Sequence, residues 1–479
     1  MSTTSEATGP IAVIGGAVTR LFQRVMPDPF VLAVLLTLLT ALLALVFGEF
    51  APAAGGGSPG LGERAMLLLD AWRDDVDGLW KFLGFAMQMC LILVTGHAVA
   101  ASPPVRRLLD GLAAIPRSTI SAAALVAVTA GLMSLINWGL CLIVGAIIAR
   151  ETARSLTRRG IPPTPALLAA AGYTGMMIWH GGLSGSAPLS MTSAENAAKV
   201  LRPETMQALA AAGYEKGIPL DETLASPLNL VVTGGLLVLV PLTLALLAKG
   251  TPVAHNAAEP AAGGAGDAAP APSTSAAPFA DKLDRSPIIS WLIAVPLLIA
   301  VAVFIAKSGL QHIGLNEINA AMLGLGLVLH GSPRSYLAAA EEGARGCMGI
   351  IIQFPLYAGI MAMMAASGLI GQLSGAIVGL GGATTAPLLT FFSAGIVNLF
   401  VPSGGGQWGV QGPIAIQTAL DTGIDPGRMV MAVAFGDQLT NMLQPFRALP
   451  LLAITGVKAR DIVGYTAIVM LVGGVFTAA

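Results

Sequence analysis

A charge-free run near the C-terminal end of the chain holds the residues with the most unusual chemistry. From Gly346 to Leu420 there is no Asp, Glu, Lys, Arg or His, yet residues 401–413 combine two prolines, a serine, three successive glycines and two glutamines. Such a segment exposes peptide N–H and C=O groups, which hydrocarbon tolerates only where protein or a water-filled cavity satisfies them. The run therefore predicts a broken element inside a membrane that binds an ion or a small polar ligand.

Asp437 is the acidic side chain best placed to hold a cation or a proton at membrane depth. It lies inside the apolar segment of about 429–452, where an ionised side chain costs at least about 2.5 kcal/mol. A buried carboxylate must keep a counter-ion or take up a proton. Because Arg428 lies only nine residues upstream, the alternative that Asp437 contacts water at the outer end of the segment stays open.

Asn137 and Asn398 are the best paired candidates for neutral oxygen ligands. Each has a serine nearby in the same predicted element, Ser134 in the first case and Ser403 in the second. Neutral oxygens suit a hard cation, so we predict a Na⁺ site at the two asparagines that couples with Asp437. The alternative is that an asparagine caps a helix terminus instead.

A carboxylate substrate would need donors, and the chain offers backbone N–H groups, hydroxyls and amides at predicted half-helix ends. The predicted substrate-binding residues are Ser184, Gly185, Ser186, Ser403, Gly404, Gly405, Gly406, Gln407, Asn441 and Gln444. No Lys or Arg lies in 120–149 or 386–419. This favours a small monocarboxylate over an acid with two or three charges.

Three further polar residues each allow two interpretations. On a continuous helix Arg447 would lie about 9 Å from the centre of its span, so snorkelling to the interface is favoured over pairing with the substrate. His97 and His180 could relay protons, although a single His on an apolar helix is more often a hydrogen-bonded packing residue. The roles of these three residues stay open.

Composition identifies the chain as a membrane protein. It has 479 residues, of which 55% are hydrophobic and 11% charged, and its mean hydropathy is +0.77, values far from those of a soluble domain. A net charge of −1 gives no reason to expect nucleic acid as a partner. The abundance of Ala and Gly favours a bacterial inner membrane.

The elements that must position these residues are about nine spans and two re-entrant hairpins. Spans need about 20 apolar residues, and the Lys/Arg bias of short loops puts the N-terminus in the cytoplasm. Two basic clusters flank the segment of about 120–149 and lie 33 residues apart, too close for two crossings, so this segment must enter and leave on the cytoplasmic side. Residues 179–188 hold too much Gly and Ser for one unbroken helix.

An internal repeat relates two parts of the chain. Gln88 matches Gln353 at an offset of 265, and Asn137 matches Asn398 at an offset of 261. The segment that begins at Tyr173 matches a later one at an offset of 262. The predicted crossings run the two units in opposite directions, so the repeats are inverted and the second hairpin, about 386–419, enters from the other side.

The repeat divides the chain into three predicted parts. These are a first half at 1–249, a flexible cytoplasmic linker at 250–286, and a second half at 287–479 that begins with a connecting span. The linker is rich in Ala, Pro, Gly and Ser, a composition that cannot bury a core. Inverted repeats with broken helices that meet at the midplane are typical of secondary transporters.

Eight stretches carry a family resemblance: 85–89, 94–98, 136–139, 182–186, 353–355, 401–406, 411–413 and 444–446. On these stretches the chain closely resembles the short-chain fatty acid transporter family, the AtoE-like proteins. The resemblance implies uptake of acids of the acetoacetate and butyrate type, coupling to an ion, and an elevator-like movement of the hairpins against a dimeric scaffold. The chain departs from the family pattern at three positions, with Asp437 in place of Glu, Gln407 in place of His and Arg447 in place of an aromatic residue.

We therefore expect an all-α polytopic membrane protein that moves small monocarboxylates by symport with Na⁺ or H⁺. The expected partners are the carboxylate substrate, the lipid bilayer and a second copy of the chain in a homodimer, and no cofactor is expected beyond Na⁺ as a candidate coupling ion. A Na⁺-coupled dicarboxylate carrier and a passive carboxylate channel are the alternatives. The sequence has no nucleophile–base set and no ATP-binding loop, so enzymatic activity is not expected.

Overall fold

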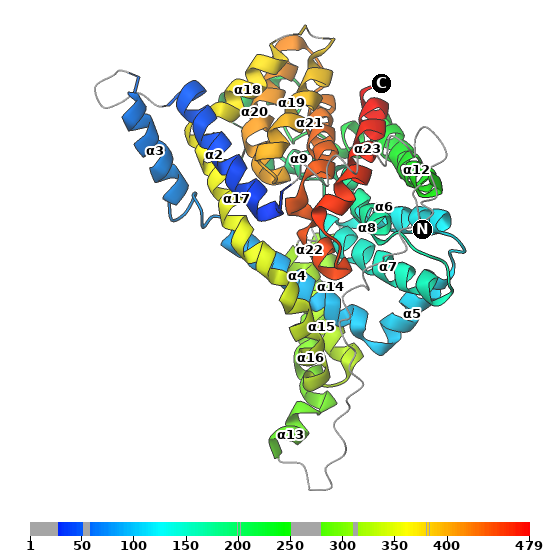
Figure 1. Cartoon of the computed structure of the whole chain (residues 1–479). Helices are drawn as coiled ribbons and strands as arrows, with labels where there is room; N and C mark the ends of the chain where they lie inside the picture. Colours follow the sequence, from blue (N-terminus) through cyan, green and yellow to red (C-terminus); the bar gives the residue numbers. More distant parts are fainter. Residues whose placement is uncertain are drawn as a thin grey trace.

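The computed structural model describes residues 27–50, 58–198, 200–201, 203–250, 279–309, 315–379, 381–382 and 384–479. All regular secondary structure in these ranges is helical, as Figure 1 shows. The predicted cytoplasmic N-terminus and residues 251–278 of the predicted linker lie outside the described residues. The last part of that linker is helical, because it holds a short helix, α13 (Phe279–Asp284).

Seven helical segments in the described ranges are long and apolar enough to cross a membrane, which confirms a multi-pass membrane protein. They are α2 (Pro29–Phe47), α4 (Leu83–Ala101), α6 (Thr119–Ile136), α12 (Pro227–Gly250), α14 (Pro287–Ser308), the stretch Pro333–Ala366 and α23 (Ala459–Ala478). The stretch Pro333–Ala366 consists of α16 (Pro333–Ala344), the 3₁₀ turn η5 (Arg345–Cys347) and α17 (Met348–Ala366). The count of nine spans stays a prediction, because the other predicted crossings are interrupted or short.

Two helical hairpins occupy the predicted positions. In the first, α6 packs against α7 (Trp138–Arg158), and Asn137 alone separates them. In the second, residues 401–403 separate α19 (Ala386–Phe400) from α20 (Gly404–Thr422). The serine at the second break, Ser403, caps α20 by accepting the N–H of Gly406. That these hairpins re-enter the membrane from opposite sides stays a prediction.

Each hairpin is followed by an interrupted helical segment. The first consists of α8 (Pro165–Tyr173), η1 (Thr174–Met177), η2 (Trp179–Gly181) and α9 (Ser186–Ser190). The second consists of α21 (Pro426–Thr440), η6 (Asn441–Leu443) and α22 (Pro445–Thr455). The break expected at 179–188 is therefore present. Such breaks place helix ends inside the protein, because His180, Asn441 and Gln444 beside them are buried.

The packing of the two repeat helices is reciprocal. Helix α4, which carries Gln88, packs against α15 (Leu315–His330) and α16 from the second half of the chain. Helix α17, which carries Gln353, packs against α2 of the first half (Figure 1). It also packs against α3 (Leu61–Arg73) of the same half. A two-fold relation between the repeats would produce this arrangement, in which each repeat helix packs against helices of the other half. The predicted boundaries of the halves are not tested by it.

Short helices complete the described fold. They are α5 (Pro103–Ala114), α10 (Ala194–Ala197), α11 (Pro203–Ala211), η3 (Leu220–Glu222) and α18 (Leu369–Val378). The buried side chains of α6, α7, α8 and α21 belong to one large apolar core. The core includes residues of the breaks themselves, among them Met177, Trp179 and Met442.

A backbone contact between two glycines holds α7 against α8. A Cβ atom on Gly145 would lie 2.3 Å from the carbonyl oxygen of Gly172, and one on Gly172 would lie 2.5 Å from the oxygen of Gly145. Any side chain here would separate the first hairpin from the interrupted segment that follows it. The glycines are therefore required by close helix packing.

We predict that Gly145→Ala lowers the stability of the purified protein by about 1–3 kcal/mol, the usual cost of overpacking. The measurement is the thermal unfolding midpoint in detergent. Gly234→Ala on α12 is the matched control, because a Cβ there has no atom within 4 Å, and its midpoint should not fall. Equal midpoints for Gly145→Ala and the native protein would contradict the packing role.

Candidate carboxylate site

A small cavity of about 130 Å³ lies where the hairpin tips meet the interrupted segments; we call it the central cavity. Its walls are mainly apolar and aromatic, and one rim is polar. The lining residues are Phe85, Met89, Trp138, Trp179, Ser186, Phe354, Pro402, Ser403, Gly404, Gly405 and Arg447. This volume is below the roughly 300–1,000 Å³ of pockets for drug-sized ligands, so the cavity suits a small molecule such as a short carboxylic acid.

Packed aromatic rings make the apolar wall. The ring centroids of Phe85 and Phe354 lie 5.4 Å apart, those of Phe85 and Trp138 6.0 Å apart, and those of Trp138 and Trp179 6.3 Å apart. These spacings are typical of stabilising aromatic pairs. The rings come from α4, α17, the start of α7 and η2, so the wall joins both halves of the chain.

The tip of the second hairpin makes the polar rim. Helix α20 begins at Gly404, and the N-terminus of a helix attracts anions through its free N–H groups and its dipole. A Cβ on Gly404 would lie 2.9 Å from the Trp179 ring and 3.0 Å from Ser186 Oγ. Only glycine allows this approach, which brings the end of α20 onto η2 and α9.

Arg447 is the one charged side chain among the lining residues of this cavity. Its guanidinium carbon lies 5.6 Å from the centroid of the Trp179 ring, and Nη2 lies 3.6 Å from Asp437 Oδ1. With 9% exposure, the side chain points inward. The favoured interpretation of snorkelling is therefore wrong. That interpretation assumed a continuous helix, whereas the chain is extended at Gln444 and α22 starts anew at Pro445.

Asp437 lies between Arg447 and His180. Asp437 Oδ1 is 3.2 Å from His180 Nε2, and the two side chains are 2% and 1% exposed. Neither Asp437 oxygen and neither His180 ring nitrogen makes a well-formed hydrogen bond with the described residues. The backbone N–H of His180 donates to Gln438 Oε1 at 3.1 Å, which ties η2 to α21. The carboxylate thus has two basic neighbours at ion-pair distance.

Amide side chains behind Asp437 hold the break in place. Asn398 Nδ2 donates to the Asp437 carbonyl at 2.7 Å and to Asn441 Oδ1 at 2.9 Å, and Gln444 Nε2 donates to the Asn398 carbonyl. Tyr173 Oη donates to the carbonyls of Asn441 and Gln444. The side-chain oxygens of Asn398 and Gln444 are buried and accept no hydrogen bond from the described residues.

The predicted substrate-binding residues fall into two groups. Ser186, Ser403, Gly404 and Gly405 line the cavity. The remaining six are not among its lining residues: Ser184, Gly185, Gly406, Gln407, Asn441 and Gln444.

Most residues of the second group have structural contacts of their own. Ser184 Oγ accepts the N–H of Trp138 at 3.0 Å. The fully buried Gln407 donates to the Ala394 carbonyl and to Gln411 Oε1, both at 2.8 Å. Gln407 therefore links the two helices of the second hairpin.

Asn137 and Asn398 do not occupy equivalent positions. Asn137 lies in the break of the first hairpin, where its Oδ1 accepts the N–H groups of Gly139 and Leu140 as a helix cap. Asn398 lies inside α19, one turn before the break of the second hairpin. The residue that caps α20 is Ser403, so Ser403 is the structural counterpart of Asn137. The Na⁺ site at the two asparagines stays a prediction.

The aromatic wall and Arg447 are the features that sequence reasoning missed or left open. Phe85 and Met89 are one helical turn apart on α4, and they lie in a stretch that carries the family resemblance. Spacing of this kind marks a helix face, but it does not say whether that face meets lipid, core or a cavity. Only the fold distinguishes these cases.

Comparison with known proteins decides the family. The sequence profile described as "Short chain fatty acid transporter" matches residues 11–479. The chain belongs to the short-chain fatty acid transporter family. This transporter is 37% identical over 466 residues to a protein of Escherichia coli K12 that carries the provisional name short-chain fatty acid transporter, with 97% of this chain and 98% of that protein covered. A protein of Haemophilus influenzae with the same provisional name is 34% identical over 461 residues, with 95% and 96% covered.

Solved structures similar to this transporter are more distant. The Alcanivorax borkumensis YdaH transporter has a TM-score of 0.41 at 16% identity, with 94% of this chain and 98% of that chain covered. The Neisseria gonorrhoeae protein MtrF has a TM-score of 0.38 at 16% identity, with 96% and 97% covered. The site of this transporter is therefore interpreted from its own residues.

A double-mutant cycle tests whether Arg447 and Asp437 stabilise each other. Arg447→Gln leaves a buried carboxylate and Asp437→Asn leaves a buried guanidinium, so each single change should cost about 3–5 kcal/mol of stability. The double variant should lose less than the sum of the two, with a coupling energy of at least about 1 kcal/mol. The measurement is the unfolding midpoint of the four proteins in detergent. Additive losses would contradict a direct interaction.

Proposed function

We propose that this transporter is a secondary active symporter of short-chain monocarboxylates, of the acetoacetate and butyrate type, driven by protons. The observation that supports it is the position of Arg447, which lines a small apolar cavity and also lies 3.6 Å from Asp437. One cation is therefore shared between a fixed carboxylate and the place where a substrate carboxylate would bind.

The sharing of Arg447 gives a mechanism for coupling. The substrate carboxylate binds Arg447 and the N–H groups at the start of α20, while its short tail lies against the aromatic wall. The attraction between Arg447 and Asp437 then weakens, because Arg447 also binds the substrate anion. A buried carboxylate that loses the attraction of its counter-ion takes up a proton. His180, 3.2 Å away, is placed to pass that proton on.

Charge balance sets the stoichiometry of one cation to one monocarboxylate. The empty site contains Arg447 and ionised Asp437, with a net charge of zero. The loaded site contains Arg447, the substrate anion and protonated Asp437, again with a net charge of zero. Both states avoid carrying a net charge through hydrocarbon, which is costly. A dicarboxylate would leave one negative charge unpaired, which disfavours the dicarboxylate alternative.

Sodium is the second candidate for the coupling cation. The buried oxygens of Asn398 and Gln444 accept no hydrogen bond from the described residues, and neutral oxygens near a carboxylate are the ligands that Na⁺ would use. The two basic neighbours of Asp437 argue for the proton, because they oppose a metal cation at the same carboxylate.

Four further features remain proposals. A homodimer and an elevator-like movement rest on the family resemblance, a cytoplasmic N-terminus rests on the Lys/Arg bias of the short loops, and a bacterial inner membrane rests on composition.

Uptake of radiolabelled butyrate and acetoacetate into proteoliposomes tests the proposal. One set has an inward proton gradient and the other an inward Na⁺ gradient, and protein-free liposomes give the baseline because the uncharged acids cross bilayers unaided. We expect the initial rate of uptake to exceed this baseline under the proton gradient alone. A rate above the baseline that only Na⁺ drives would transfer the coupling role to sodium, and a rate above the baseline that neither gradient stimulates would favour a channel.

Asp437→Asn separates coupling from substrate binding. The variant should lose the gradient-driven uptake rate above the protein-free baseline and keep exchange of internal for external butyrate, because Arg447 and the helix end remain. Asp421→Asn, at an exposed residue near the end of α20, is the matched control and should behave like the native protein. A gradient-driven rate above the baseline that survives Asp437→Asn would remove Asp437 from the mechanism.

A further inference from the structure

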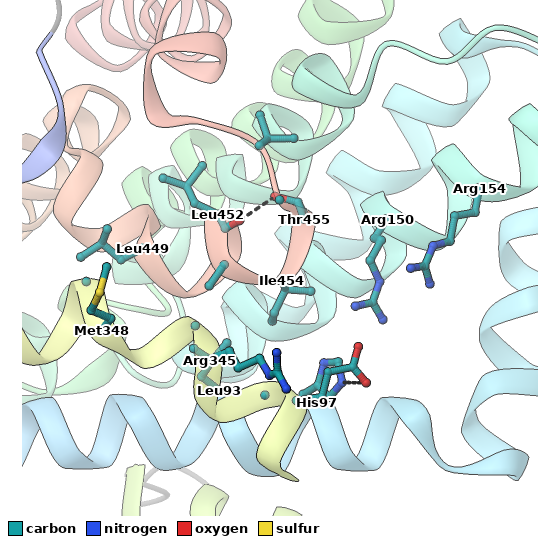
Figure 2. A pocket seen from close by; sticks show the side chains of 17 residues that line it. Leu93, His97, Arg150, Arg154, Arg345, Met348, Leu449, Leu452, Ile454 and Thr455 are labelled. Atoms are coloured by element: carbon teal, nitrogen blue, oxygen red, sulfur yellow. Dashed lines mark hydrogen bonds and ion pairs between the residues drawn. The ribbon is translucent and has the colours of Figure 1, made fainter. Parts of the chain in front are cut away.

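A second and larger cavity lies beside the central cavity; we call it the vestibule. It has a volume of about 600 Å³ and is lined by residues of α4, α7, α16, η5, α17, α22 and the turn after α22. Figure 2 shows Arg150 and Arg154 projecting from α7 on one side, and Arg345 close to His97 on another. No prediction from the sequence concerned this cavity.

The vestibule carries an excess of positive charge. Three arginines and one carboxylate, that of Glu342, are among its lining residues. Behind the wall, Glu151 Oε1 lies 3.0 Å from Arg150 Nε and 2.9 Å from Arg154 Nη1. Glu342 Oε2 lies 3.4 Å from His97 Nε2. The exposed Arg345 makes no ion pair with any described residue, so its guanidinium is available to an anion.

The two cavities share three helices. On α4, Phe85 and Met89 line the central cavity, and the next residues at the same spacing of four, Leu93 and His97, line the vestibule. Helices α17 and α22 also contribute to both. Met89 and Leu93 are separated by about 6 Å along the helix axis. The vestibule is therefore about one helical turn from the carboxylate site.

The side chains of Leu93 and Leu449, which line the vestibule, lie close to two glycines. A Cβ on Gly346 would lie 3.0 Å from Leu93 Cδ2, and one on Gly349 would lie 3.6 Å from Leu449 Cδ2. Leu93 and Leu449 are therefore side chains of the vestibule wall that lie close to η5 and α17.

We propose that the vestibule is a second, weaker binding site for the substrate carboxylate, with Arg345 as its main ligand and Arg154 as a supporting cation. The site holds the anion as it passes between water and Arg447. A cleft with a net positive charge raises the local concentration of anions. This inference rests on the proposed function for the identity of the anion.

Labelling of a cysteine in the vestibule tests the site without any transport. Gly349→Cys is suitable because its Cβ would have no neighbour closer than 3.6 Å, and the native Cys90, Cys141 and Cys347 are first replaced by Ala. The purified protein reacts with an anionic and with a cationic methanethiosulfonate of similar size at low ionic strength. The ratio of the two rates is compared with the ratio for 2-mercaptoethanol.

We expect the anionic reagent to be favoured about tenfold or more over the free-thiol ratio, and butyrate to slow it more than chloride at equal ionic strength. Arg345→Gln should reduce both effects severalfold. Arg107→Gln, at an exposed arginine of α5 that does not line the vestibule, is the matched control and should change neither. A ratio equal to that of the free thiol, or protection by butyrate no better than by chloride, would overturn the proposal.

Transport kinetics provide a second test with the native cysteines in place. Arg345→Gln should raise the KM for butyrate by about threefold to tenfold and leave kcat unchanged, as expected when binding outside the central cavity is weakened. Arg107→Gln should leave both constants unchanged. An unaltered KM in Arg345→Gln would overturn the vestibule site and leave the coupling role of Asp437 untouched, so the two proposals fail separately.

Discussion

The carboxylate of Asp437, held away from water beside one arginine, is the interaction on which the rest of the site depends. Removing two ions from water costs several kcal/mol per ion, and the contact between them offsets this only when the geometry is good and the remaining atoms are hydrogen-bonded. Here the closest approach of Arg447 is 3.6 Å, and the Asp437 oxygens accept no well-formed hydrogen bond from the described residues. The contact therefore offsets little of the cost of removing the two ions from water. At such a site the substrate carboxylate can replace the Asp437 carboxylate as the partner of Arg447.

The architecture around Asp437 follows from the need to bring helix ends and polar backbone groups into an apolar protein. A Cβ on Gly436 would lie 2.1 Å from the Phe391 carbonyl oxygen, so α19 can touch α21 directly beside Asp437 only because that position is glycine. In the same way, α20 can approach Trp179 closely only because residue 404 is glycine. These contacts place the start of α20, the aromatic wall and Arg447 around one small volume, where the low polarity strengthens every electrostatic interaction.

Much of the fold could be predicted from the sequence because membrane depth imposes long apolar helices, and Gly, Ser and Pro mark where those helices break. The hairpin tips, the break at 179–188 and the burial of Asp437 at membrane depth could be predicted in this way. The direction of Arg447 was not, since periodicity is lost where the chain becomes extended at Gln444. The pairing of Asn137 with Asn398 also failed as a structural equivalence. The sequence match pairs Asn137 with Asn398 at an offset of 261. In the structure the residues that cap α7 and α20 are Asn137 and Ser403, which are 266 residues apart.

If substrate binding at Arg447 leads to protonation of Asp437, the protein must take up protons as it binds butyrate. Butyrate is added to the purified protein in weakly buffered detergent solution near pH 7, and the pH change is recorded together with the amount of butyrate bound. We expect uptake of about one proton for each butyrate bound, and no uptake in Asp437→Asn. Binding of butyrate by the native protein without proton uptake would show that substrate binding does not protonate Asp437.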